Sequence, residues 1–503
     1  MGGLFNMGSD GRGGWIPGMY SSAKAAGATA SLNGVMFSDA ADTPSWEQLA
    51  LRVAELRAQH GLPVDPDLEN GPANPHALVR RFGTTEEPRV MFYRDHAAWC
   101  PYCEKIWMQL EEKRIPYRVE KINMRCYGDK KKSFTDKVPQ GMLPVMEIDG
   151  KLLTESAAIA AALEEKFPNH TPLLPPRGTP ERLRADSLMK LERNLFGMWM
   201  QWLTSGWGEG QNRSGFEDAL DAVEGQLASA PGGGPYFMGD KLGLVDITFT
   251  PFLERMASSL AYYKGFKMEG NGGRWKKVDA WYAAMSTRET YKHIKSDYYT
   301  HAHDLPPQLG GCEANGDAEQ VALMSEIDGT VQGRKDTVGS SWRLPLPPLN
   351  ALSPEPIWHP ESPDADRLEA AAKLVSNHVN IARFAARGCG EKGNRPVSAP
   401  LADPTAKPGE AHVPAVDAAL RRVAHELLEG SAVASAAGGG GSTLSGGAGA
   451  AFAAEPTAAS LAYLRDRVGV PRDMHYPAAR QLRAHLNWFI DGLQPAAAGG
   501  ARK

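Results

Sequence analysis

The 503-residue sequence contains few cysteines, and none of its apolar runs approaches the ~18 residues that a membrane-spanning helix needs. Its five cysteines are too few and too scattered for a disulfide framework, which indicates a reducing compartment. It also lacks an excess of charge of one sign, because the formal net charge is -4 with 23% charged residues. The sequence therefore favours a soluble protein, with neither a nucleic acid nor an anionic membrane as its partner.

The length of the chain predicts two or three folded units, because it exceeds what one ordinary hydrophobic core can hold. Residues 1–43 are expected to form a disordered or targeting segment, since small and polar residues dominate them. Arg12 and Lys24 are the only basic residues among the first 38, so the pattern of a transit peptide is incomplete. Residues 44–88 are expected to form an N-terminal extension that begins with a short helix.

Residues 89–168 alternate between the patterns of strands and helices. Strands are expected at residues 90–93, 117–122, 145–148 and 151–153, and helices at 103–113, 130–137 and 156–167. The dipeptide Asp149-Gly150 favours the type I′ turn of a hairpin. The order βαβαββα predicts an α/β domain with a small mixed sheet and helices on both faces, which is the thioredoxin-like arrangement.

The remainder of the chain has a helical period. Residues 180–304 are expected to form an all-helical domain, with helices at 180–204, 216–230, 245–260 and 274–285. Residues 305–362 are rich in proline and glycine and are expected to form an extended surface linker. Residues 363–496 are expected to form a further helical region with a flexible insert at 431–455 and helices at 365–387, 416–428, 458–468 and 478–493.

The motif Cys100-Pro101-Tyr102-Cys103 lies where the first expected strand of the α/β domain meets the next helix. Free backbone N–H groups and the helix dipole at that position favour an anion, so a Cys100 thiolate would be stabilised. Cys103 lies one turn further into the helix, close enough to attack a mixed disulfide on Cys100. Redox chemistry is favoured over structural zinc, because no second CxxC or paired histidine supplies the remaining ligands.

Two further motifs lie where a ligand could bind. Leu143-Pro144 opens the third expected strand, where a cis bond would turn the main chain of Leu143 towards the thiol for pairing with an extended peptide. The alternative is an ordinary proline at the start of a strand. Glu155 and Ser156 lie at the next helix N-terminus, where they could hold an amino-acid-like ligand, and N-capping by Ser156 is expected as well.

These motifs, in this order and spacing, make residues 89–300 similar to a glutathione transferase, a thioredoxin-like domain followed by an all-α domain. The Cys-Pro-Tyr-Cys motif matches glutaredoxins, and its place in a two-domain chain resembles the cysteine-type omega and lambda transferases. The resemblance implies that glutathione is the cosubstrate and that Cys100 is the catalytic cysteine. It also implies a set of glutathione-binding residues: Leu143 and the cis-proline Pro144 at the cysteinyl backbone, Glu155 and Ser156 at the γ-glutamyl end, and Lys130 or Lys131 at the glycine carboxylate.

The sequence departs from the pattern of the family at two positions. Omega and lambda transferases usually lack a cysteine where Cys103 stands, so this chain could also run dithiol chemistry. In the helical domain, the family has Ser or Thr three residues before a buried aspartate. Here Asp246 is present but Gly243 occupies the cap position, so the capping hydrogen bond is expected to be lost.

The wider sequence, from residues 94–99 through 471–474, resembles a group of glutathione transferase-like proteins of plants and algal plastids. This resemblance implies a chloroplast location, with the cytoplasm as the alternative. The helices of the C-terminal region carry apolar faces, which predict a homodimer or a protein partner.

The sequence as a whole predicts an enzyme, a glutathione-dependent thiol transferase or disulfide reductase acting through the Cys100 thiolate. Its substrate would be a disulfide or an oxidised small molecule, and no metal is expected in the site. One alternative is a catalytically silent scaffold or binding protein that keeps the transferase fold. A further alternative is conjugation of glutathione to electrophiles, which a cysteine at this position disfavours because it tends to form mixed disulfides.

Overall fold

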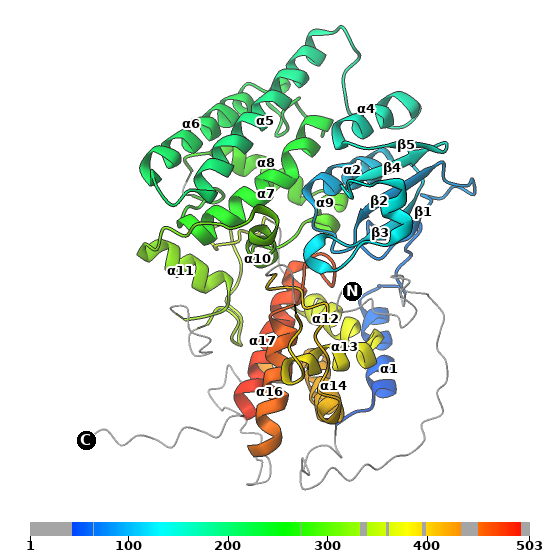
Figure 1. Cartoon of the computed structure of the whole chain (residues 1–503), viewed down its shortest axis with the longest axis vertical. Coiled ribbons are helices and arrows are strands. Elements are labelled where there is room, and N and C mark those ends of the chain that lie inside the picture. The colour runs from blue at the N-terminus through cyan, green and yellow to red at the C-terminus, as the bar shows by residue number, and fades with distance from the viewer. Residues whose placement is uncertain are drawn as a thin grey trace.

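The computed structural model describes residues 43–63, 65–271, 273–331, 340–358, 362–394, 399–433 and 451–493 (Figure 1). The expected disordered or targeting segment therefore lies outside the described residues except for Thr43, and so does most of the expected flexible insert. In the described part of the chain, no helix has the length and apolar character needed to cross a membrane.

A five-stranded sheet forms the centre of the first domain, with the strand order β1-β3-β2-β4-β5. Its strands are β1 (Val79–Arg80), β2 (Val90–Asp95), β3 (Tyr117–Ile122), β4 (Val145–Ile148) and β5 (Lys151–Leu153). β2 and β3 are parallel, and the other neighbours are antiparallel. The expected thioredoxin-like domain is confirmed, and the two-residue β1 is an additional edge strand, too short to carry a sequence pattern.

Helices cover both faces of this sheet. Phe92 and its partner Met146 belong to the core beneath α2 (Pro101–Lys113) and α4 (Ser156–Lys166), whereas Tyr93 and Val145 pack with Phe134 of α3 (Lys132–Lys137) on the other face. Successive strand residues alternate between the faces, as the pleat requires. The expected hairpin turn is present, with positive φ values of 53° at Asp149 and 77° at Gly150.

An all-helical domain follows, with α7 at its centre. Nearly every residue of α7 is buried, and α7 contacts α5, α10, α11 and α2, the helix that begins directly after Cys100. α7 spans Leu244–Lys264, and the other helices of this domain lie around it: α5 (Pro180–Thr204), α6 (Glu209–Ala228), α8 (Lys276–Ser286), α9 (Glu289–Ile294), α10 (Tyr298–Leu309) and α11 (Ala318–Ile327). One continuous hydrophobic core therefore joins this domain to the sheet.

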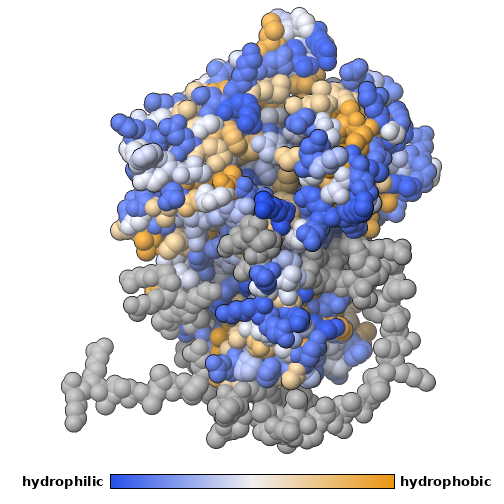
Figure 2. All heavy atoms as spheres, viewed as in Figure 1, coloured by the Kyte–Doolittle hydropathy of each residue, from blue (hydrophilic) through white to orange (hydrophobic). Residues whose placement is uncertain are grey.

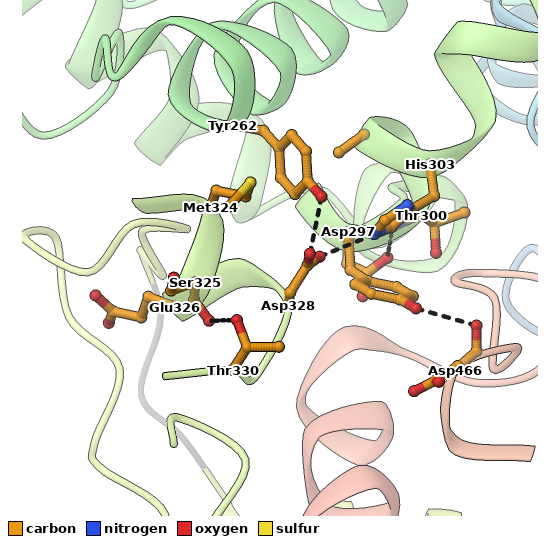
Figure 3. Close-up of polar contacts among 12 residues, drawn as sticks. Tyr262, Asp297, Thr300, His303, Met324, Ser325, Glu326, Asp328, Thr330 and Asp466 are labelled. Atoms are coloured by element: carbon orange, nitrogen blue, oxygen red, sulfur yellow. Dashed lines mark hydrogen bonds and ion pairs between the residues drawn. The ribbon is translucent and has the colours of Figure 1, made fainter. Parts of the chain in front are cut away.

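The expectation of an extended linker at 305–362 is wrong for its first part, because α10 continues through Pro306 and Pro307 and α11 follows. Pro306 has no N–H for the carbonyl of Ala302, and the hydroxyl of Tyr263 donates to that carbonyl instead, at 2.9 Å. Beyond α11, Asp328 accepts hydrogen bonds from Tyr262 Oη and His303 Nε2, both at 2.8 Å (Figure 3). These contacts fasten the segment to the helical domain.

A second core belongs to a separate helical bundle at the C-terminal end of the chain. Its helices are α12 (Pro363–Ser376), α13 (His378–Ala385), α14 (Val413–Glu429), α16 (Ala451–Arg465) and α17 (Tyr476–Leu493). The single helix expected at 365–387 is broken at Asn377, where φ is -143°. α16 starts earlier than expected and includes residues 451–455 of the proposed flexible insert.

The bundle is completed by α1 (Trp46–Gln59) from the start of the described chain (Figure 1). Trp46 stacks on His378 with ring centroids 4.6 Å apart and donates to Asp417 at 2.8 Å. The two halves of the molecule meet where the start of α10 lies near α17 (Figure 1). On the face drawn in Figure 2, hydrophilic and hydrophobic residues are interspersed over the described surface. A buried ion pair joins them, in which Arg483 Nη1 lies 2.7 Å from Asp297 Oδ2.

Candidate active site

The topology of the sheet brings the three motifs singled out in the sequence to one edge of the sheet, at the ends of its strands. β4 is antiparallel to β2, and β5 is antiparallel to β4, so β5 runs in the same direction as β2. Cys100 follows β2, Leu143-Pro144 precedes β4, and Glu155 follows β5. All three positions therefore lie at the edge where β2 ends, although they are separated by up to 55 residues in sequence.

Cys100 occupies the N-cap position of α2, with Pro101 as the first helical residue. Its side chain is half-buried and makes no capping hydrogen bond, while its carbonyl accepts from the N–H of Glu104 at 2.9 Å. The thiol thus lies at the positive end of the helix dipole, with access to solvent. This is the environment in which a cysteine acts as a nucleophile.

Cys103 and Asp95 complete a small buried cluster around that thiol. One carboxylate oxygen of Asp95 and the sulfurs of Cys100 and Cys103 all lie within 4.8 Å of one another, and both Asp95 and Cys103 are 1% exposed. Burial raises the pKa of Cys103 well above its usual range, and its hydrogen bond to Cys100 and the nearby negative charges of Cys100 and Asp95 add to this effect. Cys103 therefore stays protonated and can donate to a Cys100 thiolate.

Asp95 was missed by sequence reasoning, although an acid that ends a buried strand five residues before the thiol was a usable signal. Its carboxylate accepts from the N–H of Trp99 at 2.6 Å, which fixes the loop between β2 and α2. The same carboxylate is the nearest candidate to receive the proton of Cys103 when that thiol reacts, directly or through one water.

The Leu143–Pro144 peptide bond is cis, as the resemblance to glutathione transferases implied. Pro144 is buried and Leu143 is half-buried at the start of β4. The next residue, Val145, is paired with Tyr93 of β2, so this segment lies beside the strand that leads to Cys100.

Glu155 is the N-cap residue of α4, and its φ of 65° lies in the left-handed region that residues other than glycine seldom adopt. Its side chain is exposed, and Ser156 is half-buried. The expected N-capping by Ser156 is wrong, because Ser156 is the first helical residue and no side chain caps α4. Such a backbone conformation costs about 1–3 kcal/mol and is frequent at functional sites.

Of the two candidate lysines, the structure brings Lys130 to the thiols and leaves Lys131 exposed at the start of α3. Lys130 Nζ donates to the carbonyl of Asn123 at 2.8 Å, and its methylenes lie against Gly141, which has a φ of 64°. Burial lowers the pKa of Lys130, and the thiols of Cys126, Cys100 and Cys103 act in the opposite direction when they are ionised. Of the two lysines, Lys130 is therefore the one that lies nearer to this edge of the sheet.

Known glutathione S-transferases match the part of the chain that holds this arrangement. Residues 99–166 match the glutathione S-transferase N-terminal domain, and residues 189–293 match the glutathione S-transferase C-terminal domain. Glutathione S-transferase DHAR2 of Arabidopsis thaliana is 28% identical over 197 residues, which is 39% of this chain and 84% of that protein. Pyrimidodiazepine synthase of Drosophila melanogaster is 27% identical over 191 residues, 37% of this chain and 73% of that protein.

Among solved structures, glutathione transferase Omega 3C from Trametes versicolor has 27% sequence identity and a TM-score of 0.37, and the match covers 42% of this chain and 91% of that chain. Both family matches lie within residues 99–293, so the C-terminal bundle lies outside them.

Proposed function

Because residues 99–293 carry the N-terminal and C-terminal domains of a glutathione S-transferase, we propose that this protein is a glutathione-dependent thiol transferase or disulfide reductase that acts through Cys100. The observation that carries the proposal is the placement of a half-exposed thiol at the N-terminus of α2, with a buried, protonated Cys103 beside it. A transferase that uses a tyrosine or serine only to ionise bound glutathione would not need a thiol such as Cys103 beside its catalytic residue.

The reaction follows from this geometry. The Cys100 thiolate attacks the glutathione sulfur of a mixed disulfide, a Cys100–glutathione disulfide forms, and the substrate thiolate leaves and takes up a proton. A second glutathione, as its thiolate, then attacks the glutathione sulfur of that adduct, which releases oxidised glutathione and restores the Cys100 thiolate. In sum, the mixed disulfide and one free glutathione are converted to the substrate thiol and oxidised glutathione, and Cys100 is regenerated.

The glutathione site proposed for this chemistry uses the groups gathered at the sheet edge. The main chain of Leu143, next to Pro144, would pair with the cysteinyl residue of glutathione. The N-terminus of α4, with Glu155 and Ser156, would hold the γ-glutamyl end, and Lys130 would meet the glycine carboxylate. The exposed position of Lys131 makes it the weaker of the two candidates.

Cysteine substitutions test the proposal. Cys100→Ser is expected to abolish glutathione-coupled reduction of hydroxyethyl disulfide and of an oxidised small molecule such as dehydroascorbate, because a hydroxyl cannot replace the thiolate. Cys103→Ser is expected to keep most of this activity and to lose only reactions in which a second protein thiol must release a bound protein. If both variants turn over like the parent, Cys100 is not the nucleophile. If the parent itself turns over neither acceptor, a silent scaffold becomes the better description.

We also propose a chloroplast location, with the cytoplasm as the alternative. Glutathione S-transferase DHAR3 of Arabidopsis thaliana, 28% identical over 59% of its length, is chloroplastic, and a 25% identical relative in rice is cytosolic. A fluorescent fusion at the C-terminus of the whole chain would distinguish the two compartments. The same protein, purified, would show by sedimentation whether it forms a homodimer.

A further inference from the structure

The main chain of Trp99, directly before Cys100, is held on both sides by charged side chains. Its N–H donates to the Asp95 carboxylate at 2.6 Å, and its carbonyl accepts from Nη2 of Arg255. Arg255 belongs to α7 of the helical domain, 156 residues further along the chain. Asp95 therefore holds the peptide that precedes Trp99, and Arg255, from the other domain, holds the peptide between Trp99 and Cys100.

Arg255 makes several further contacts that fix its own position. Its Nη1 lies 3.0 Å from Oε2 of Glu104 and 2.5 Å from the carbonyl of Pro251, and its guanidinium lies 4.7 Å from the centroid of the Trp99 ring. Arg255 is 1% exposed, and Glu104 lies one turn after Cys100 on α2. The guanidinium thus bridges the residue before the thiol and the first turn of the helix that carries it.

The loop that carries Trp99 needs such a restraint. Ala98 has a φ of 56°, a left-handed conformation that is unfavourable for alanine, and both Ala98 and Trp99 are buried. A strained backbone persists only where surrounding contacts enforce it. The two hydrogen bonds of the Trp99 main chain, one from its N–H to Asp95 and one from Arg255 to its carbonyl, are contacts of this kind.

The guanidinium also brings a positive charge to the base of the thiol. Burial raises the pKa of Glu104 well above its usual range and that of Glu254 to about 7, so these two acids do not fully neutralise Arg255 near neutral pH. On the remaining side, burial and the charge of Arg255 hold the pKa of His301 well below its usual range, and that ring is neutral. Arg255 is therefore the positive charge that this buried group places against the main-chain carbonyl before Cys100.

From these contacts we infer that Arg255 is a positioning residue for Cys100, holding the peptide before the thiol and favouring its thiolate from the helical domain. The inference rests on the proposed thiol chemistry and assigns a role to a buried residue of the helical domain that lies outside the proposed glutathione site. It follows that the reactivity of the thioredoxin-like domain depends on its docking against α7.

The test compares Arg255→Met, which removes the charge and the hydrogen bonds, with Arg255→Lys, which keeps the charge but not the fork of donors. We expect Arg255→Met to slow alkylation of Cys100 by iodoacetamide at about pH 7 by about tenfold or more, and Arg255→Lys to fall between it and the parent. Mass spectrometry of the Cys100 peptide reports the site of alkylation. At about pH 10, where any exposed thiol is largely ionised, the three rates should converge if the charge dominates. The other ionisable groups that face Cys100, namely Cys103, Asp95 and Lys130, are unchanged in all three proteins.

Two controls separate positioning from loss of stability. Arg483→Met removes another buried, ion-paired arginine, far from the thiol in sequence, and should destabilise the protein without changing the rate of Cys100 alkylation. Glu104→Gln removes the other partner of Arg255 and should leave the rate within about threefold of the parent, because the bond to the Trp99 carbonyl remains.

Folding of each variant is checked by circular dichroism and thermal unfolding. Parent-like alkylation in both folded Arg255 variants would overturn the inference, as would an equal loss in Arg483→Met. If Arg255→Met does not fold, Arg255→Lys decides alone. Because alkylation needs no glutathione, this outcome is independent of whether the parent shows the proposed turnover.

Discussion

At the scale of single residues, the main chain of Glu155 has an unusual conformation at the edge of the proposed glutathione site. A φ of 65° is unfavourable for glutamate, yet it directs an exposed carboxylate beyond the N-terminus of an uncapped helix. The amine of an amino-acid-like ligand could pair with that carboxylate, while a ligand carboxylate could meet the first N–H groups of α4. Conformation and chemistry therefore agree at this residue.

We expect Glu155→Ala to weaken glutathione binding by about 1.5–3 kcal/mol, the range for losing a charge-assisted hydrogen bond. Glu155→Gln should have a similar effect while keeping the size of the side chain. Isothermal titration calorimetry measures the affinity. The matched control is Glu165→Ala, an exposed glutamate on the same helix, which should bind like the parent. Unchanged affinity in both Glu155 variants would remove Glu155 from the site.

At the scale of an element, the start of α7 shows how the structure compensates for the missing cap. Gly243 offers no side chain, and the buried Asp246 accepts instead from the N–H groups of Gly243 and Phe237 and from the indole of Trp281, at 2.9 to 3.1 Å. Burial nevertheless raises the pKa of Asp246 to about 6, although these hydrogen bonds act to lower it. The ionised form of Asp246 is therefore less favourable in the folded protein than in the unfolded chain.

This raised pKa has a consequence for stability. Between the ordinary pKa of 3.8 and about 6, the folded protein holds a proton on Asp246 that the unfolded chain has lost. Stability contributed by this group is thus fully present below about pH 4 and falls as the pH rises towards 6, by about 3 kcal/mol in total. We expect the difference in urea unfolding midpoint between the parent and Asp246→Asn to shrink across this range, since asparagine does not titrate. A difference that is constant or grows between about pH 4 and about pH 6 would contradict this prediction.

At the scale of the whole molecule, the C-terminal bundle is docked on the transferase domains by buried polar contacts as well as apolar ones. Asp297 caps α10 through the N–H of Thr300 and pairs with Arg483 of α17. Nearby, the N–H of Val470 donates to the hydroxyl of Thr300, and the hydroxyl of Tyr299 donates to the carbonyl of Asp466. The bundle and the transferase domains should therefore depend on each other for stability.

Asp297→Asn tests this dependence, because asparagine keeps the cap but removes the negative charge. A buried arginine left without its partner costs about 3–5 kcal/mol, so we expect a clear fall in the unfolding temperature measured by calorimetry. The control is Glu429→Gln, which breaks the exposed pair with Arg52 and should cost less than about 1 kcal/mol. Equal shifts in the two variants would show that the buried pair does not hold the halves together.

The local features of this protein could be predicted from its sequence. Four of the five strands of the sheet, the Asp-Gly hairpin and the limits of α5 follow from periodicity and from the preferences of particular residues. The thiol pair at a helix N-terminus is equally local, because strand, loop and helix are adjacent in the chain. The wrong prediction of a linker at residue 305 also had a local cause. The proline-rich sequence around residue 306 indicated a linker, because the hydroxyl of Tyr263 that donates to the free carbonyl of Ala302 is distant in sequence.

The tertiary structure alone decided which distant groups meet. Periodicity reports which face of a helix is buried but not what covers it, so the joining of α1 to the C-terminal bundle could not be inferred. The contact of Arg255 with the peptide before Cys100 could not be inferred either. A buried charge is stabilised only by partners that the fold brings to it. The partners of Arg255, Glu104 and Trp99, lie about 150 residues away in the chain. The sequence determined where the thiol chemistry is; the packing of α7 against α2 determined how that thiol is held.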